Sequence, residues 1–253
     1  MEELGDTATK AAVRRFWDER PCAESLADAP RGTDEYYGDI ETAKERLEPF
    51  VHRYAEFEKW RGRDVLEIGC GVGTDSVRFA RAGAVLTAVD LTETAVELTR
   101  GWLASESLPG TVLQADAERL PFADETFDLV YSWGVLHHTP ETARALAEVR
   151  RVLRPGAEAR IMLYNRRSFF AAGVWLRHGL LHRRPVSVRS VLATHLESPG
   201  TQAFTRRELE TLFAGFASVE IETVTTPYDR RVVGPPAGLL PRAGWFHVVR
   251  ATV

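Results

Sequence analysis

Apolar runs alternate with amphipathic segments from residue 64 onward, in the order that a parallel sheet requires. The run "DVLEIG" at 64–69 is typical of a buried strand, and "GTDSVRFARAG" at 73–83 has the spacing of a helix that ends at Gly83. The same alternation predicts strands over 84–90, 111–116, 127–133 and 157–165, and helices over 92–105 and 142–153. This pattern predicts a doubly wound α/β fold.

The last third of the chain has a different pattern. "TRRELETLFAGF" at 205–216 predicts a helix, and "SVEIETVTT" at 218–226 and "GWFHVVRATV" at 244–253 predict two strands. The connection between these strands is rich in proline and glycine, which indicates an antiparallel edge of the sheet. An "RPG" turn at 154–156 is expected to separate the helix over 142–153 from the strand that follows it.

Three glycines follow the first strand at alternate positions, Gly69, Gly71 and Gly73. Ligands of such folds bind at the carboxyl ends of the strands, and a missing Cβ lets a ligand approach the backbone. The dinucleotide fingerprint needs its third glycine where this chain has Thr74, so the spacing argues against a nicotinamide dinucleotide. Asp90 ends the second strand, where a carboxylate can accept hydrogen bonds from ribose hydroxyls. Together these residues favour a nucleoside ligand over a tight turn and a helix-capping aspartate.

Five segments in a fixed order resemble the motifs of the class I S-adenosylmethionine-dependent methyltransferases. They are "VLEIGCGVGT", "AVD" at 88–90, "ADAERLPF" at 115–122, "FDLVYSWGVLHHTPE" at 127–141 and "EVRRVLRPGA" at 148–157. The resemblance covers roughly residues 50–165 and implies a Rossmann-like seven-stranded sheet with an antiparallel last strand. It also implies S-adenosylmethionine as cofactor and S-adenosylhomocysteine as product.

The resemblance assigns cofactor-binding roles by position. It places Glu67 and the glycine turn, with Gly69, Cys70, Gly71 and Gly73, at the methionine end, Asp90 at the ribose, Asp116 and Ala117 at the adenine, and Leu91 and Trp133 near the cofactor. The chain is then expected to divide into an N-terminal helical lid (1–48), a cofactor-binding core (49–165), an inserted substrate cap (166–204) and the C-terminal part of the core sheet (205–253).

Methyl transfer from a sulfonium is a one-step displacement, so the protein mainly aligns the acceptor and excludes water. His138 and His137 follow the fourth strand and are expected to serve as base if the acceptor is a hydroxyl, although local structural packing explains such histidines equally well. A carboxylate acceptor needs no base. The residues expected to bind substrate are Tyr36, Tyr37, Tyr164, Arg166 and His195, and no metal is expected.

The acceptor is expected to be a small-molecule or peptide natural product, with oxygen methylation favoured. Carbon or nitrogen methylation and a non-catalytic cofactor-binding protein remain alternatives. Two other enzyme classes are excluded: the three lysines, Lys10, Lys44 and Lys59, all precede the glycine turn and cannot supply the pair of a short-chain oxidoreductase, and two cysteines cannot hold an iron–sulfur cluster.

Composition and charge limit the kinds of partner that the chain is expected to bind. A net charge of −4 gives no nucleic-acid signature, and the longest strongly apolar stretch, Phe169 to Leu176, is far shorter than the roughly 20 residues of a membrane span. Two cysteines and an N-terminus without a signal pattern indicate a cytoplasmic protein. Ten arginines against one acid between Arg150 and Arg189 suggest an anionic or amphipathic acceptor, or else a solvated face; the oligomeric state stays open.

Overall fold

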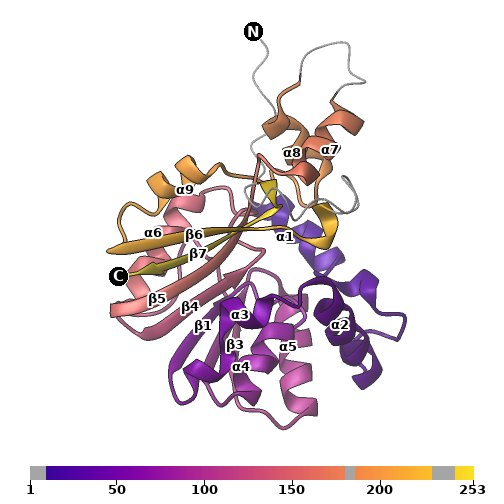
Figure 1. Ribbon diagram of the computed structural model, residues 1–253. Helices are drawn as coiled ribbons and strands as arrows, with labels where there is room; N and C mark the ends of the chain where they lie inside the picture. Colours follow the sequence, from indigo (N-terminus) through magenta and orange to yellow (C-terminus); the bar gives the residue numbers. More distant parts are fainter. Residues whose placement is uncertain (1–9, 180–185, 230–242) are drawn as a thin grey trace.

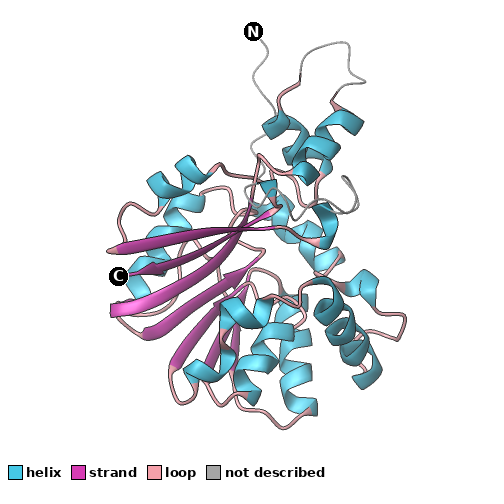
Figure 2. Ribbon diagram, in the orientation of Figure 1, coloured by secondary structure: helices cyan, strands magenta, loops and turns pink. Residues whose placement is uncertain are grey.

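The computed structural model describes residues 10–179, 186–229 and 243–253, and one seven-stranded sheet runs through this part of the chain (Figures 1 and 2). The strands are β1 (Asp64–Ile68), β2 (Val85–Asp90), β3 (Thr111–Gln114), β4 (Phe127–Trp133), β5 (Leu153–Tyr164), β6 (Ser218–Val224) and β7 (Phe246–Thr252). Their order is β3-β2-β1-β4-β5-β7-β6, and only β7 runs antiparallel to its neighbours. The predicted Rossmann-like sheet with a reversed last strand is confirmed.

Helices cover both faces of this sheet. They are α1 (Lys10–Glu19), α2 (Asp34–Leu47), α3 (Val51–Ala55), α4 (Thr74–Arg81), α5 (Glu93–Ser105), α6 (Thr142–Val152), α7 (Phe169–His178), α8 (Val188–His195) and α9 (Arg206–Leu212), with short 3-10 turns at Glu24–Leu26 and Phe57–Trp60. Successive β1 side chains point to opposite faces, so Val65 packs with α2 to α5 and Leu66 packs with α6 and α9. Both faces of the central strands are therefore buried, as parallel strands require.

The predicted stop at "RPG" is wrong. β5 begins at Leu153, directly after α6, and continues through Pro155 and Gly156. Leu153 pairs with Phe127 and Glu158 pairs with Leu129, so the residues between them form a bulge opposite β4. Such a bulge accepts a proline that has no N–H and a glycine at φ +79°, and the turn is absorbed into the strand.

Several other predicted elements end earlier than the sequence pattern suggests. β3 stops at Gln114 because Asp116 turns the chain, accepting a hydrogen bond from the amide of Glu118 at 2.9 Å. β6 stops before Thr226, whose amide and hydroxyl both donate to the buried carboxylate of Asp229 at 2.9 and 3.0 Å. The same carboxylate accepts the amide of Trp245 at 2.8 Å, which fixes the entry into β7. Side-chain capping, rather than loss of hydrophobic pattern, decides these ends.

The segments before and between the core elements lie at the carboxyl end of the sheet. Figure 1 shows α1, α7 and α8 beyond the strand ends, away from α4 and α5. The α7 and α8 pair packs on β5 and β7 through Ala171, Leu192, Tyr164 and Trp245. Parts of the expected lid (1–9), cap (180–185) and closing connection (230–242) lie outside the described residues. Within the described ranges, no helix combines the length and the apolar character needed to cross a bilayer.

Candidate active site

One pocket opens where β1, β2 and β4 end, as the glycine pattern predicts. Its walls combine the turn after β1, the end of β2, the loop after β4 and the N-terminal segment, and its lining residues include Lys10, Trp17, Cys22, Lys44, Glu67, Gly69, Cys70, Gly71, Asp90, Leu91, Asp116, Ala117, Trp133 and His138. Most of the predicted cofactor-binding residues are therefore brought together at one site. Gly73 is the exception, because it sits behind the turn against Thr99 of α5.

Gly69 and Gly71 of the turn are glycines for different structural reasons. Gly69 has φ +81°, and a Cβ there would lie 2.2 Å from the Cγ2 of Val135, so the loop after β4 occupies that space. Gly71 has φ +55°, and a Cβ there would meet only the Cβ of Cys22, at 3.7 Å. Gly69 thus serves packing and Gly71 leaves room over the backbone, where a ligand can approach.

Asp90 sits between the turn and α5. Its Oδ1 accepts hydrogen bonds from the amide and hydroxyl of Thr92 at 2.9 and 2.8 Å, and its Oδ2 accepts the amide of Gly71 at 3.1 Å. Burial raises the pKa of this carboxyl, and the surrounding hydrogen bonds act in the opposite direction. Oδ2 keeps a free lone pair that can accept from a ribose hydroxyl.

The predicted adenine end is closed by α1. The ammonium of Lys10 lies 2.5 Å from Asp116 Oδ2 and 2.6 Å from Glu118 Oε2. Burial alone would raise the pKa of Glu118, but hydrogen bonds from Lys10 and Thr139 hold it below its ordinary value. Lys10 therefore ties the N-terminal helix to the pocket rim, a contact that sequence reasoning missed because no motif contains this lysine.

Carboxylates gather at the other end of the turn. Glu67 is buried and accepts a hydrogen bond from Ser76; burial, together with the neighbouring Asp75, raises its pKa. Lys44 of α2 is a cation at this end, 3.0 Å from Glu48 Oε2. Burial would lower the pKa of Lys44, but Glu48, Cys22 and Asp75 together raise it above its ordinary value. Sequence reasoning missed Lys44 and Glu48, since α2 lies outside every motif.

Trp133 links this end to the sheet. Its indole Nε1 donates to Glu48 Oε2 at 2.9 Å, and its ring stacks on Tyr131 with a centroid distance of 6.0 Å. The ring position is therefore fixed, with the side chain facing the pocket as predicted.

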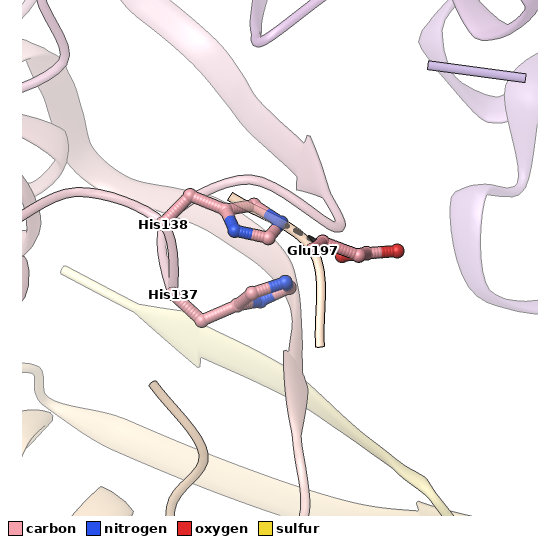
Figure 3. Close-up of side chains that lie close together, drawn as sticks. All are labelled: His137, His138 and Glu197. Carbon is pink, nitrogen blue, oxygen red and sulfur yellow. Dashed lines mark ion pairs between the residues drawn. The ribbon is translucent and has the colours of Figure 1, made fainter. Parts of the chain in front are cut away.

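At the acceptor end of the pocket, His137 and His138 point the same way, toward Glu197 (Figure 3). His138 Nε2 lies 3.2 Å from Glu197 Oε2, and the hydroxyl of Tyr164 donates to the same oxygen at 3.0 Å. His138 lines the pocket and contacts Trp17 edge-on, whereas His137 is fully buried on the ring of Tyr164. Glu197 follows α8 and was not predicted from the sequence.

Four predicted substrate residues lie away from this pocket. Tyr36 and Tyr37 are core residues: Tyr37 stacks on Trp102 at 4.8 Å and donates to the carbonyl of Leu98 at 3.0 Å. Tyr36 packs edge-on against Tyr37 at 5.5 Å, and neither tyrosine lines the pocket, which corrects that prediction. Arg166 forms an ion pair with Glu208 at 2.7 Å, and His195 stacks on His178 at 4.6 Å.

Half of the ten arginines in the basic stretch form ion pairs among the described residues. Ion pairs hold Arg151 with Asp124 and Glu148, Arg154 with Asp64 and Asp128, Arg160 with Glu56 and Glu158, and Arg166 and Arg189 with Glu208. Arg183 and Arg184 lie outside the described residues. The pairs neutralise mainly the core arginines, and the two paired arginines of the cap share one acid.

Comparison with known proteins agrees with the geometry of the pocket. A family model described as "Methyltransferase domain" matches residues 66–161, the span that builds the pocket's core. Residues 66–161 therefore form a methyltransferase domain of the class I S-adenosylmethionine-dependent type. S-Adenosylmethionine is the cofactor of this methyltransferase fold, and the residues present fit it: an open approach at Gly71, a carboxylate at the end of β2 and polar groups at both ends of the pocket.

Two curated methyltransferases are similar over part of their length. The chain is 36% identical over 125 residues to O-methyltransferase rstn1 of Aspergillus nomiae, a match that covers 48% of this chain and 55% of that protein. It is 39% identical over 175 residues to the phthiotriol/phenolphthiotriol dimycocerosates methyltransferase of Mycobacterium leprae, covering 62% of each. The chain thus spans about half the length of the curated relatives it matches.

A solved methyltransferase structure has the same fold over nearly the whole chain. Magnesium protoporphyrin IX methyltransferase from Synechocystis PCC 6803, with bound S-adenosylhomocysteine, aligns with a TM-score of 0.64 at 14% identity, covering 96% of this chain and 99% of that one. The likeness therefore extends beyond the matched motifs to the N-terminal and cap segments, as a likeness of fold.

Proposed function

We propose that this protein transfers a methyl group from S-adenosylmethionine to an oxygen of a small-molecule acceptor. One observation carries the proposal: a single pocket joins the nucleoside-type carboxylates, Asp90 and Asp116, to an acceptor end that holds His138. A cofactor between these ends would point its transferable methyl group toward the histidine. The sulfonium supplies the methyl group, and the protein positions the methyl donor and the acceptor relative to each other.

The residues of the pocket act mainly by alignment and by exclusion of water. Gly71 lets the cofactor approach the backbone, Asp90 accepts from the ribose, and Lys44 faces the anionic methionine end. Trp17 of α1 and Trp133 of β4 form aromatic walls, which stabilise a cation and exclude solvent. Holding acceptor and methyl donor in line converts a bimolecular reaction into an effectively unimolecular one.

The acceptor oxygen is placed beside His138. The basic atoms at this end, His138 Nε2 and Glu197 Oε2, are the groups near which a hydroxyl can lose its proton. The fungal relative is called an O-methyltransferase, which supports oxygen methylation, and the mycobacterial relative is named for phthiotriol and phenolphthiotriol dimycocerosates. We therefore favour hydroxyl-bearing, partly apolar acceptors, including peptide or lipid-like natural products.

The test is turnover of methyl-labelled S-adenosylmethionine. Calorimetry with S-adenosylmethionine and S-adenosylhomocysteine first establishes binding, and a panel of hydroxylated, carboxylated and amine-bearing metabolites is then screened for label transfer. Product mass spectrometry identifies the methylated atom. Cofactor binding with no turnover on any acceptor class, and no label in a cell extract, would favour a cofactor-binding protein without catalysis. Label on carbon or nitrogen would replace the oxygen assignment.

A further inference from the structure

The turn after β4 and the turn after α8 bring three metal-ligand side chains together. One ring nitrogen of His137, one of His138 and one carboxylate oxygen of Glu197 all lie within 4.8 Å of one another. Figure 3 shows both rings directed at the carboxylate. Residues about 60 positions apart in the sequence meet here, and none of the cofactor-binding contacts described above uses either His137 or Glu197.

Hydrogen bonds around His138 fix which nitrogen faces Glu197. Nδ1 lies 3.0 Å from the hydroxyl of Thr201 and 2.9 Å from the hydroxyl of Ser198. The Thr201 hydroxyl donates to the carbonyl of Ser198 at 2.6 Å, so its oxygen can accept from Nδ1, and in that tautomer the lone pair of a neutral ring lies on Nε2. Nε2 and Glu197 Oε2 face each other at 3.2 Å, a spacing that suits a positive centre between them, either a proton or a metal ion.

His137 adds a second, independent observation. Its ring is fully buried, and neither ring nitrogen has a hydrogen-bond partner among the residues that the structure describes. A buried, unpaired imidazole nitrogen is unfavourable unless it ligates something, and this one is directed at the same carboxylate. A shared proton between His138 and Glu197 would leave His137 unsatisfied, whereas a metal ion would satisfy all three side chains.

We propose that His137, His138 and Glu197 bind a divalent transition-metal ion of the Zn²⁺ or Co²⁺ type. Two imidazoles and one carboxylate are a ligand set for these ions rather than for Mg²⁺, which prefers oxygen. Bonds of about 2.0–2.1 Å in a tetrahedral site place ligand atoms roughly 3.3 Å apart. The His138 and Glu197 atoms already have this spacing at 3.2 Å, and the partly exposed Glu197 side chain can move toward His137 to complete it.

The surroundings have the features of a metal site. In this tautomer His138 donates through Nδ1 to a hydroxyl, and Glu197 accepts from the hydroxyl of Tyr164, so two ligands are oriented by outer hydrogen bonds. The nearby cation, Lys44, is paired with Glu48. Three protein ligands leave a coordination position open, and His138 borders the cofactor pocket.

In the proposed methyl transfer, that open position would take the acceptor oxygen and lower the pKa of its hydroxyl, so that the proton is lost to solvent. With the ion bound, His138 Nε2 and Glu197 Oε2 would act as ligands and not as the base. This consequence rests on the proposed function, but binding of the ion does not. No metal was expected from the sequence, where His137 and His138 were interpreted as a candidate base or as packed side chains. The third ligand comes from the cap.

The test is metal binding by the full chain, expressed without a histidine tag and stripped with a chelator. Co²⁺ is titrated with visible absorption as readout, and Zn²⁺ is used to displace it. The variants are Glu197→Gln, which keeps shape and the Tyr164 contact, and His137→Phe, which keeps the ring on Tyr164. His195→Gln is the matched control, since it removes a cap histidine outside the cluster.

We expect one Co²⁺ per chain, with the tetrahedral-type spectrum of a nitrogen and oxygen site. Glu197→Gln and His137→Phe should each weaken binding by at least about tenfold, and His195→Gln should leave it unchanged. Binding of S-adenosylhomocysteine by every variant shows that the fold is intact and is scored separately. No stoichiometric Co²⁺ binding by the wild-type chain, or equal binding by all variants, overturns the proposal and leaves a His138–Glu197 pair that shares a proton.

Discussion

At the residue scale, Asp90 is the side chain on which the nucleoside site most depends. Asp90→Ala should weaken S-adenosylhomocysteine binding by about 1.5–3 kcal/mol, the usual loss for hydrogen bonds to a charged group. Because Asp90 also holds Thr92 and the Gly71 amide, Thr92→Val serves as control: it loses one contact of the support and keeps the carboxylate. Titration calorimetry measures both variants. Unchanged affinity in a folded Asp90→Ala protein would remove this residue from the site.

The glycine turn offers a matched pair of substitutions. Gly69→Ala and Gly71→Ala both place an alanine at positive φ, which costs about 1–2 kcal/mol in each case. Only the Gly69 variant adds a clash, with Val135, so its unfolding midpoint in denaturant should fall further. The Gly71 variant should instead lose cofactor affinity in a folded protein. Equal destabilisation of the two variants would show that the loop after β4 moves away from the added methyl group at little cost in free energy.

At the element scale, we expect α1 to act as a lid, with Lys10 as its ionic tie to the pocket rim. The cavity is about 150 Å³, smaller than the roughly 300–1,000 Å³ of small-molecule sites, so α1 must shift to admit the cofactor. Lys10→Met removes the ties to Asp116 and Glu118 and should speed hydrogen exchange across α1 in the ligand-free protein. Arg14→Met is the control, because the ion pair of Arg14 in the described part of the chain is with Asp18 of the same helix. The same exchange rates in both variants would mean that packing of Trp17 holds the helix instead.

Prediction from sequence succeeded where one short pattern decides an element. All seven strands were found, because buried parallel strands and the closing pair have strong apolar periodicity, and most of the cofactor site followed from the turns between them. Prediction failed where contacts between residues far apart in the sequence determine the position of a side chain. Lys10 and Lys44 reach the pocket from helices outside the motifs, and Glu197 contacts His138 from the turn after α8. Tyr37 looked like a lid residue only because its partner Trp102 lies far along the chain. Spacing along the chain carries no information about such pairs.

At the scale of the whole molecule, one pocket at the carboxyl ends of β1, β2 and β4 contains both the predicted nucleoside-binding residues and His138. The cap lies beside it, since Glu197 contacts His138 and the cap helices pack with Tyr164 and Trp245 of the core. We expect substrate choice to change with the cap while the sheet keeps the cofactor in place. The closing edge of the sheet is formed by β6 and by β7, which lies between β5 and β6.

A buried histidine on that edge makes stability depend on pH. His247 lies in β7, its Nδ1 is 3.0 Å from the hydroxyl of Thr223, and burial together with Arg206 lowers its pKa to about 4, from an ordinary value of 6.5. Between these two values the unfolded chain binds the proton and the folded chain does not. Stability from this group is thus complete above pH 6.5 and is lost as the pH falls toward 4.

A second titratable group, Glu208, makes stability depend on pH over a lower pH range. The pKa of Glu208 is lowered from 4.5 to about 2: burial would raise it, but Arg166 and the Thr205 cap outweigh burial, so its contribution is lost only below pH 4.5. His247→Phe should therefore flatten the fall in melting temperature between pH 6.5 and 4, whereas Glu208→Gln should leave that window unchanged and flatten the fall below it. Calorimetric melting at several pH values separates the two. If His247→Phe melts with the wild-type slope above pH 4.5, protonation of His247 does not control acid unfolding, and groups outside the β6–β7 edge must do so.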